Sequence, residues 1–334
     1  MIGIKDVAQE AGVSVATVSY YVNGTRPVSE KSARRVEAAI EKLNYTPNYS
    51  ARSLRTRKNN SIAFITHRLT NEFFPEVIEA VADVAYSHGY SLFLSLTQNR
   101  REEELNEFRI MITRQVSGII IAPTQMDFNY RSLCPDDKFP LVFVDRAPKS
   151  QNADSIRCEN YNVTYRAITE LIQRGHQNIA FLAPKRDPYH NELILTTRHD
   201  RFSAYRQALE DHGIKKVHCY EDGLISRDWG YKIMKQILEN PEITATFISN
   251  NIVAQGAWQC LIDEQISVPK RMALVSFDSG NWSRLVSPTL STIEQPAAEM
   301  GRLAAETIFE RIQNPEMTYR RIVLDSKLSL RESI

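Results

Sequence analysis

The sequence predicts an all-α head joined to an α/β core that contains two parallel-sheet lobes. First, residues 4–43 hold three short stretches whose apolar residues recur at helical spacing. Second, from residue 61 onward buried-strand runs alternate with longer helical patterns, which is typical of a parallel sheet covered by helices. Third, the alternation restarts near residue 178, so we expect two copies of one arrangement.

The composition is that of an average globular chain. Of 334 residues, 43% are hydrophobic and 24% charged. No apolar run approaches the roughly 18 residues that a transmembrane helix needs, and the first residues reach Lys5 and Asp6 at once, unlike a secretory signal. The four cysteines form no C-x-x-C pair and no zinc spacing. We therefore expect a cytoplasmic protein with no membrane contact, no metal and no cofactor.

The net charge of +1 conceals an uneven distribution. Residues 1–60 carry ten Lys and Arg against five Asp and Glu, a net charge of +5, which leaves −4 for the remainder. Because a basic segment attracts polyanions, we expect the head to bind one.

The head contains three predicted helices. One face of the first is apolar, made by Ile4, Val7, Ala8 and Ala11. Gly12 then supplies a tight turn, and Ser14 is placed to cap a second helix over residues 15–22. Ser29 can cap a third helix, whose apolar stripe ends at Leu43.

Helix, short turn and helix make the helix-turn-helix pattern. The outer face of the second helix is small or polar, with Val15, Ala16, Thr17, Ser19 and Tyr20. Such a face can lie deep in the major groove of DNA, where hydroxyl groups reach phosphates and N-terminal side chains reach base edges. The residues alone leave a solvated helix face open as the alternative.

Four segments of the head closely resemble the lactose/galactose repressor (LacI/GalR) family of transcription regulators. They are Ile4-Lys5-Asp6-Val7-Ala8, Ala11-Gly12-Val13-Ser14, Ala16-Thr17-Val18-Ser19 and Leu43-Asn44-Tyr45-Thr46-Pro47-Asn48. The resemblance implies base-reading positions at Val15, Ala16 and Tyr20. It also implies phosphate contacts by Thr17, Ser19 and Asn23.

Tyr20 departs from the family pattern, since many members carry Arg at this position. Arg grips guanine through two hydrogen bonds, and Tyr cannot. We therefore expect an operator that differs from the commonest half-site of the family.

Residues 47–58 resemble a hinge that becomes helical on binding. The stretch after Pro47 lacks Gly and Pro and carries four positive charges. So short a helix is marginal in water, and we expect it to fold only with a partner or DNA. The family resemblance assigns Leu54 as an apolar wedge in the minor groove, with Ala51 on the same helix surface. Without that resemblance, a plain basic linker with an incidental Leu is the favoured interpretation.

The core alternates strands and helices twice. Predicted strands of the first copy are 61–65, 91–94, 118–121 and 141–145, and residues 178–182 echo 61–65 in the second copy. Later strands are expected near 217–219, 245–248 and 273–277, with helices near 200–212 and 227–239. Such lobes are Rossmann-like, and polar residues at their strand ends face a cleft.

The core also resembles the family, whose core is of the type I periplasmic-binding-protein kind. The matching positions include Arg174-Gly175-His176, Phe277-Asp278, Ile293, Gln295-Pro296 and Gly301. The domains are thus expected at 1–46 (head), 47–59 (hinge) and 60–334 (effector-binding and dimerisation core). Lobe 1 is expected at about 60–158 and 293–320, and lobe 2 at about 159–290 and 321–334.

Seven strand-end residues match family positions that line the cleft. They are Phe73, Phe74, Asp145, Arg201, Asn250, Asp278 and Gln295. Carboxylates accept from vicinal hydroxyls, Arg donates a planar fork and aromatic rings cover the apolar face of a sugar. We therefore expect a small effector, a sugar or sugar derivative, although a loop cap or surface charge is the ordinary role of such residues.

The cleft positions also depart from the family in three places. Asn251 follows Asn250 where Asp is usual, Ile225 stands where relatives often place an aromatic lid, and Ala297 replaces a bulky residue. Two hypotheses follow: either the pocket is roomier on that side, or Trp282, just past Asp278, supplies the missing ring. The sequence does not name the ligand.

An enzyme reading finds no support, because there is no G-x-G-x-x-G, Walker lysine loop, H-E-x-x-H or G-x-S-x-G. We expect a repressor that binds a pseudo-palindromic double-stranded operator as a homodimer and is switched allosterically by its effector. One alternative is control by a partner, a regulatory phosphocarrier protein. Another is an enzyme or transport receptor with an accessory head.

Overall fold

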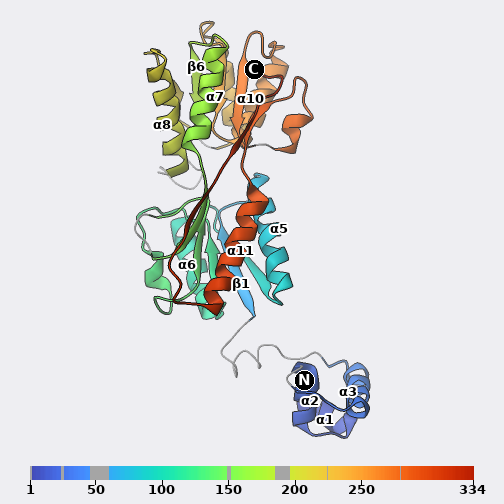
Figure 1. Ribbon diagram of the computed structural model, residues 1–334. Helices are drawn as coiled ribbons and strands as arrows, with labels where there is room; N and C mark the ends of the chain where they lie inside the picture. Colours follow the sequence, from blue (N-terminus) through green and yellow to red (C-terminus); the bar gives the residue numbers. More distant parts are fainter. Residues whose placement is uncertain are drawn as a thin grey trace. The chain divides into compact units, whose positions relative to one another are not determined.

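The computed structural model describes residues 2–23, 26–45, 60–148, 152–184, 196–223, 225–278 and 280–334. The chain divides into two compact units, residues 1–59 and 60–334 (Figure 1). The expected hinge helix, with Ala51 and Leu54, lies outside the described residues.

The head has the three helices that the sequence predicts: α1 (Ile4–Ala11), α2 (Val15–Asn23) and α3 (Glu30–Leu43). Gly12 adopts the left-handed conformation, with φ of 59°, that ends α1. The Ser14 hydroxyl accepts a hydrogen bond from the Thr17 backbone N–H at 3.1 Å and so caps α2. Ser29 caps α3 through the Ser32 N–H at 3.4 Å.

The three head helices enclose one small apolar core. Val7, Val18 and Val36, one from each helix, are fully buried in it. Because these residues point inward, the helix α2 turns its opposite face outward.

The first lobe of the core is a six-stranded parallel sheet in the order β11-β5-β4-β3-β1-β2. Its strands are β1 (Ser61–Thr66), β2 (Ser91–Leu96), β3 (Ile119–Ile121), β4 (Leu141–Val144), β5 (Asp154–Cys158) and β11 (Arg321–Leu324). The helices α5 (Phe73–Ser87) and α11 (Ala297–Gln313) pack together on one face, and α6 (Arg101–Thr113) covers the other. Alternate residues of β1 serve the two faces, Ile62 and Phe64 one face and Ala63 and Ile65 the other.

The second lobe is a six-stranded sheet in the order β12-β10-β9-β8-β6-β7, parallel except for β12, which pairs antiparallel with β10. Its strands are β6 (Ile179–Leu182), β7 (His218–Tyr220), β8 (Ala245–Ile248), β9 (Ala273–Phe277), β10 (Ser291–Glu294) and β12 (Lys327–Ser329). Its helices are α7 (Tyr161–Gln173), α8 (Thr196–Asp211), α9 (Arg227–Leu238) and α10 (Asn251–Asp263). The strand β6 pairs with β7 and β8 as β1 pairs with β2 and β3, which confirms the predicted duplication.

The lobe boundaries differ from the prediction at two strands. The chain passes between the sheets three times, at residues 159–160, 295–296 and 325–326. The strand β10 therefore belongs to the second lobe, and β11 pairs with β5 in the first. The expected assignments of 293–294 to lobe 1 and of 321–324 to lobe 2 are wrong, because such short strands carry no sign of the sheet they join.

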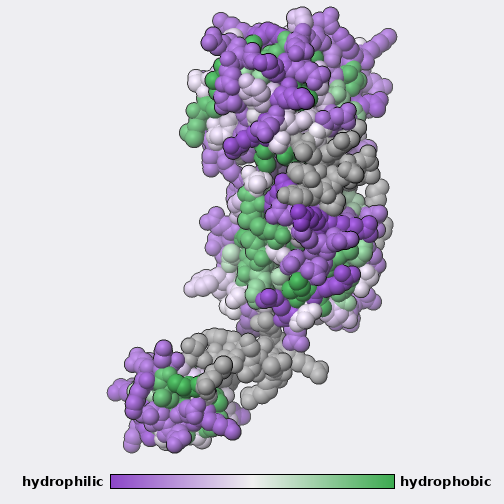
Figure 2. All heavy atoms as spheres, turned by 180° about the vertical axis from the view of Figure 1, so that it is seen from behind, coloured by the Kyte–Doolittle hydropathy of each residue, from purple (hydrophilic) through white to green (hydrophobic). Residues whose placement is uncertain are grey.

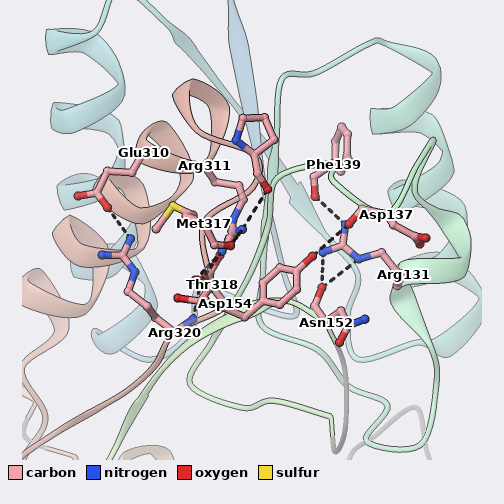
Figure 3. Close-up of polar contacts among 12 residues, drawn as sticks. Arg131, Asp137, Phe139, Asn152, Asp154, Glu310, Arg311, Met317, Thr318 and Arg320 are labelled. Carbon is pink, nitrogen blue, oxygen red and sulfur yellow. Dashed lines mark hydrogen bonds and ion pairs between the residues drawn. The ribbon is translucent and has the colours of Figure 1, made fainter.

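A buried ion pair anchors the end of α11 and the residue before β11 to the start of β5 in the first lobe (Figure 3). Arg311 of α11 donates to both carboxylate oxygens of Asp154 at 3.0 Å, and the Arg320 backbone N–H donates to the same carboxylate at 2.8 Å. The Arg311 guanidinium also donates to the Met317 carbonyl at 2.6 Å. Both side chains of the pair are almost fully buried. Each charge therefore needs the opposite charge of the other to offset the cost of its burial.

The surface of the chain is mainly polar. Figure 2 shows hydrophilic side chains over most of the visible face of the core. No helix among the described residues is both long enough and apolar enough to span a bilayer.

Candidate functional site

All seven cleft residues that the sequence predicts line one cavity of the core. Most of them follow the carboxyl ends of strands: Asp145 after β4, Asn250 after β8, Asp278 after β9 and Gln295 after β10. Parallel strands gather their carboxyl ends at one edge of a sheet, which is where ligands bind in open α/β sheets. Because both lobes contribute such edges, the cavity lies where the two sheets face one another.

Asp278 is the most heavily engaged carboxylate of the cavity. Its two oxygens accept from the Gln295 amide at 2.5 Å and the Asn71 amide at 3.2 Å. Burial raises the pKa of Asp278, and the nearby Arg201 opposes that rise. Asn71 belongs to the first lobe and Asp278 to the second, so this bond bridges the lobes.

Arg201 is held rigidly in the wall of the cavity. Its Nε donates to the Asn160 side chain and its Nη1 to the Ser249 carbonyl, both at 2.8 Å. Its guanidinium carbon lies 3.3 Å from the centre of the Phe277 ring. Burial lowers the pKa of Arg201, and the acids Asp278 and Asp145 oppose this. Nη2 has no hydrogen-bond partner in the described part of the chain, which leaves it available to a ligand.

Asn250 has a structural task as well. Its side-chain oxygen accepts from the Ile252 backbone N–H at 2.9 Å and caps α10. A ligand therefore finds only the amide nitrogen of Asn250 available as a donor.

Two aromatic rings contribute to the apolar part of the wall. Phe73 and Phe74 begin α5 and pack edge to face, with ring centres 5.1 Å apart. Phe74 also packs against His67, with ring centres 4.8 Å apart.

The lining residues that the sequence did not predict include His67, Asn71 and Arg146. Asn71 both caps the start of α5 through the Phe73 N–H and reaches Asp278. Arg146 directly follows Asp145, and its Nε lies 3.0 Å from the Asp145 carboxylate. The only sequence signal was their position in loops that follow β1 and β4.

The hypothesis that Trp282 supplies a ring to the cavity is wrong. Trp282 is not among the lining residues. Its indole N–H donates to Asn251 at 2.6 Å, and its ring packs edge to face on Trp258. Ile225 does line the cavity, so this side of the wall is aliphatic.

The predicted DNA-reading side chains lie on the outer face of α2. Val15 is 42% exposed and Ala16 is exposed, while Thr17, Ser19 and Tyr20 are partly exposed. The side chain of Asn23 lies outside the described residues. Arg26 packs over the Tyr20 ring, with its guanidinium carbon 5.2 Å from the ring centre, and so adds a positive charge beside this face.

No group of His, Cys, Asp and Glu in the described ranges could hold a metal ion. The cysteines in those ranges are free thiols. Hydrogen bonding, ring contacts and charge are therefore the means of recognition that the cavity offers.

Comparison with known proteins links both units to one family. Residues 3–48 match the bacterial regulatory proteins of the lacI family, and residues 168–334 match a periplasmic binding protein-like domain. The HTH-type transcriptional repressor PurR of Pasteurella multocida (strain Pm70) is 33% identical over 337 residues, covering 100% of this chain and 99% of its own. PurR of Histophilus somni (strain 2336) is 31% identical with the same coverage.

Solved structures share the fold. A lacI-family transcriptional regulator from Silicibacter pomeroyi has a TM-score of 0.84 and 25% identity, covering 100% of this chain and 99% of its own. The lac repressor dimer bound to operator and the anti-inducer ONPF has a TM-score of 0.84 and 24% identity, covering 99% and 98%. The chain therefore belongs to the lacI family of bacterial regulatory proteins, and it is a DNA-binding transcriptional repressor with a ligand-binding effector domain.

Proposed function

We propose that this repressor binds a pseudo-palindromic operator as a homodimer and that a small polyhydroxylated effector, a sugar or sugar derivative, switches its affinity. The convergence of Asp145, Arg201, Asn250, Asp278 and Gln295 on one cavity carries the effector proposal. These groups supply acceptors and donors within reach of one another, and the rings of Phe73 and Phe74 cover an apolar surface.

The division of roles follows from the contacts already made. The Asp278 oxygens can accept further bonds from vicinal hydroxyls, because each carboxylate oxygen has two lone pairs. Arg201 and Asn250 retain one donor group each for oxygen atoms of the ligand. A ligand with several hydroxyls satisfies both kinds of partner at once.

For DNA, we propose that Val15, Ala16 and Tyr20 read bases while Thr17, Ser19 and Asn23 hold phosphates. Support comes from the outward placement of α2 and from the net positive charge of the head. Ala51 and Leu54, in the hinge, would enter the minor groove at the centre of the operator.

The homodimer proposal is supported by exposed apolar side chains in both lobes. Leu94 and Leu96 lie on β2, an edge strand of the first sheet, and are 42% and 40% exposed. Leu285, which follows the short helix η2 (Asn281–Arg284) in the second lobe, is 84% exposed. A second copy of the chain would remove these side chains from water.

The proposed mechanism is linkage between the cavity and the hinge. An effector that favours one arrangement of the lobes shifts the equilibrium between formed and melted hinge helices, and DNA must then affect effector affinity by the same factor. Couplings of this kind amount to about 1–3 kcal/mol, a change of roughly 5–150-fold in operator affinity.

The test uses the full chain. An operator selected from a random DNA library is labelled, and its affinity is titrated with sugars, sugar derivatives and a small-molecule cell extract. We expect a polyhydroxylated compound to change operator affinity, and Arg201→Lys to lose this response, because Lys has no planar fork and cannot stack on Phe277 in the same way. Arg109→Lys, an exposed position on α6, is the matched control.

Two results would contradict the proposal. Failure to select any operator would remove the DNA-binding part. An operator affinity that no small molecule changes, but that a phosphorylated carrier protein does change, would move control from the cavity to a protein partner.

A further inference from the structure

The cavity holds more positive than negative side chains. Four arginines line it, Arg68, Arg146, Arg198 and Arg201, against two acids, Asp145 and Asp278. Arg198 is paired outside the lining, because its Nη2 lies 2.8 Å from the Glu221 carboxylate. Arg146 and Arg201 are the arginines of the described lining that lie near its two acids, Asp145 and Asp278.

Arg146 is the arginine whose bonding is least complete. Its side chain is only 8% exposed, and its Nε lies 3.0 Å from the Asp145 carboxylate. Nη1 is buried without a hydrogen-bond partner, and no partner of Nη2 is present among the described residues. In contrast, Arg201 uses two of its three nitrogens.

A buried guanidinium with unused donors is costly, because it has lost its water without gaining acceptors. Its planar fork matches the two oxygens of a carboxylate or phosphate, and bonds to such groups are stronger than bonds to neutral hydroxyls. The Asp145 carboxylate lies against Nε, so it leaves the Nη pair for another anion.

His67, which lies near Arg146, carries no positive charge that would compete for that anion. Burial, helped by Arg146 and Arg68, lowers the pKa of His67 well below its usual value, so its ring is neutral near pH 7. Its Nδ1 is buried without a hydrogen-bond partner in the described ranges. A neutral imidazole can donate one hydrogen bond to a bound oxygen.

We propose that the effector carries an anionic oxygen group, a carboxylate or a phosphate, and that the Nη pair of Arg146 binds it. The hydroxyls of the same molecule lie against Asp278, Arg201 and Asn250. This inference rests on the proposed function of the cavity and narrows its ligand class to acids of polyhydroxylated molecules.

The experiment compares matched pairs of compounds by thermal shift and calorimetry on the full chain. Each pair differs in one anionic group: glucose with glucose 6-phosphate, glucose with glucuronate, galactose with galacturonate, ribose with ribose 5-phosphate, and adenosine with its 5′-monophosphate. Phosphates and carboxylates form separate arms and so distinguish the two sources of the charge. We expect binding from an anionic member and at least about tenfold weaker binding from its neutral partner.

Substitutions of Arg146 test whether this side chain recognises the anionic group of the ligand. Arg146→Gln should lose the preference for the anionic member, while Arg146→Lys should keep part of it, because Lys retains the charge without the fork. Arg109→Gln, outside the cavity, should bind as the unmodified chain does. Because Arg146→Gln also leaves the buried Asp145 carboxylate without its ion-pair partner, the melting temperature of each unliganded variant is measured alongside binding, and this separates lost binding from lost folding.

Three results would overturn the inference. Neutral members that bind as tightly as the acids, in both the unmodified chain and Arg146→Gln, would reject the anionic group while leaving the proposed function intact. Anionic members whose affinity is unchanged in Arg146→Gln would reject the role of Arg146. Absence of binding across every pair would reject the ligand class, and the operator titration with cell extract then decides separately whether the cavity has any effector.

Discussion

Asp278 bears on both ligand binding and the stability of the folded protein. It accepts bonds from Asn71 of the first lobe and from Gln295 of the second crossing, and burial raises its pKa. An ionised carboxylate in such a place costs stability that the protonated form does not. The site therefore gives up some stability so that a charged acceptor faces the ligand.

We expect Asp278→Asn to abolish the effector response and to change the pH dependence of stability. Because the folded pKa is raised, the cost of ionisation is absent below the unfolded pKa and present in full above the folded one. The unliganded protein should therefore gain melting temperature, relative to Asp278→Asn, as the pH falls from about 7 toward about 5. Thermal denaturation of both proteins across this range checks the expectation, and identical pH profiles would contradict it.

We expect Tyr20 to influence which operator sequence the repressor prefers. Its ring packs with Arg26 on the exposed side of α2. We expect Tyr20→Arg to move the preferred base at the contacted position toward guanine, by about 1–3 kcal/mol of discrimination, because Arg can bond to two guanine acceptors. Selection from a random library, run in parallel on both proteins, measures this. The expectation fails if the unmodified protein already selects the commonest half-site of the family.

Individual residues were predictable where they follow strands. All seven residues that the family resemblance assigned to the cleft line the same cavity. Four of them, Asp145, Asn250, Asp278 and Gln295, follow strands whose ends are visible as apolar runs that stop at a polar residue. Arg146 and Asn71 were missed because each lies beside a predicted residue, and only the folded loop shows which neighbour turns inward. Trp282 was placed wrongly because its partner Asn251 is distant in the sequence.

At the scale of elements, the strand β5 shows why some of the fold could not be read from the chain. Its sequence, Asp-Ser-Ile-Arg-Cys, is too polar for the apolar run that predicts a buried strand. Asp154 nevertheless begins it, fully buried, because Arg311 of α11 neutralises it from 157 positions away. Long-range pairing of this kind overrides the local pattern.

We expect Asp154→Ala to lower the free energy of unfolding by about 3–5 kcal/mol, because it leaves the Arg311 charge buried and unpaired. Urea denaturation measures the loss. The double variant Asp154→Leu with Arg311→Met should recover much of it. Glu306→Ala, which breaks an exposed pair with Arg302 on the same helix, is the control and should change stability little. Equal losses at both pairs would contradict the importance of burial.

At the scale of the whole molecule, the two copies of the α/β arrangement were predictable and their connections were not. The repeated apolar rhythm identifies each sheet, but the three crossings are short polar segments with no distinguishing pattern. The strands β10 and β11 were consequently assigned to the wrong lobes.

The prediction for the whole molecule concerns its oligomeric state. We expect sedimentation to show a homodimer, and the pair of substitutions Leu94→Asp and Leu285→Asp to shift it toward monomer, because buried charges at an interface lack partners. The monomer should bind operator far more weakly, since one head contacts only one half-site. Ile262→Asp, another exposed apolar position, is the comparison. A stable tetramer would refute the expected state.

Two of the crossings between the lobes are hydrogen-bonded to side chains that line the cavity. Asn160, which holds Arg201, lies in the first crossing, and Gln295, which holds Asp278, lies in the second. The Ser326 hydroxyl of the third crossing donates to the Glu159 carbonyl of the first at 2.9 Å. A ligand that contacts Arg201 is thus one hydrogen bond from the first crossing and two from the third, and a ligand that contacts Asp278 is one hydrogen bond from the second. Binding is therefore expected to act directly on the segments that connect the two lobes.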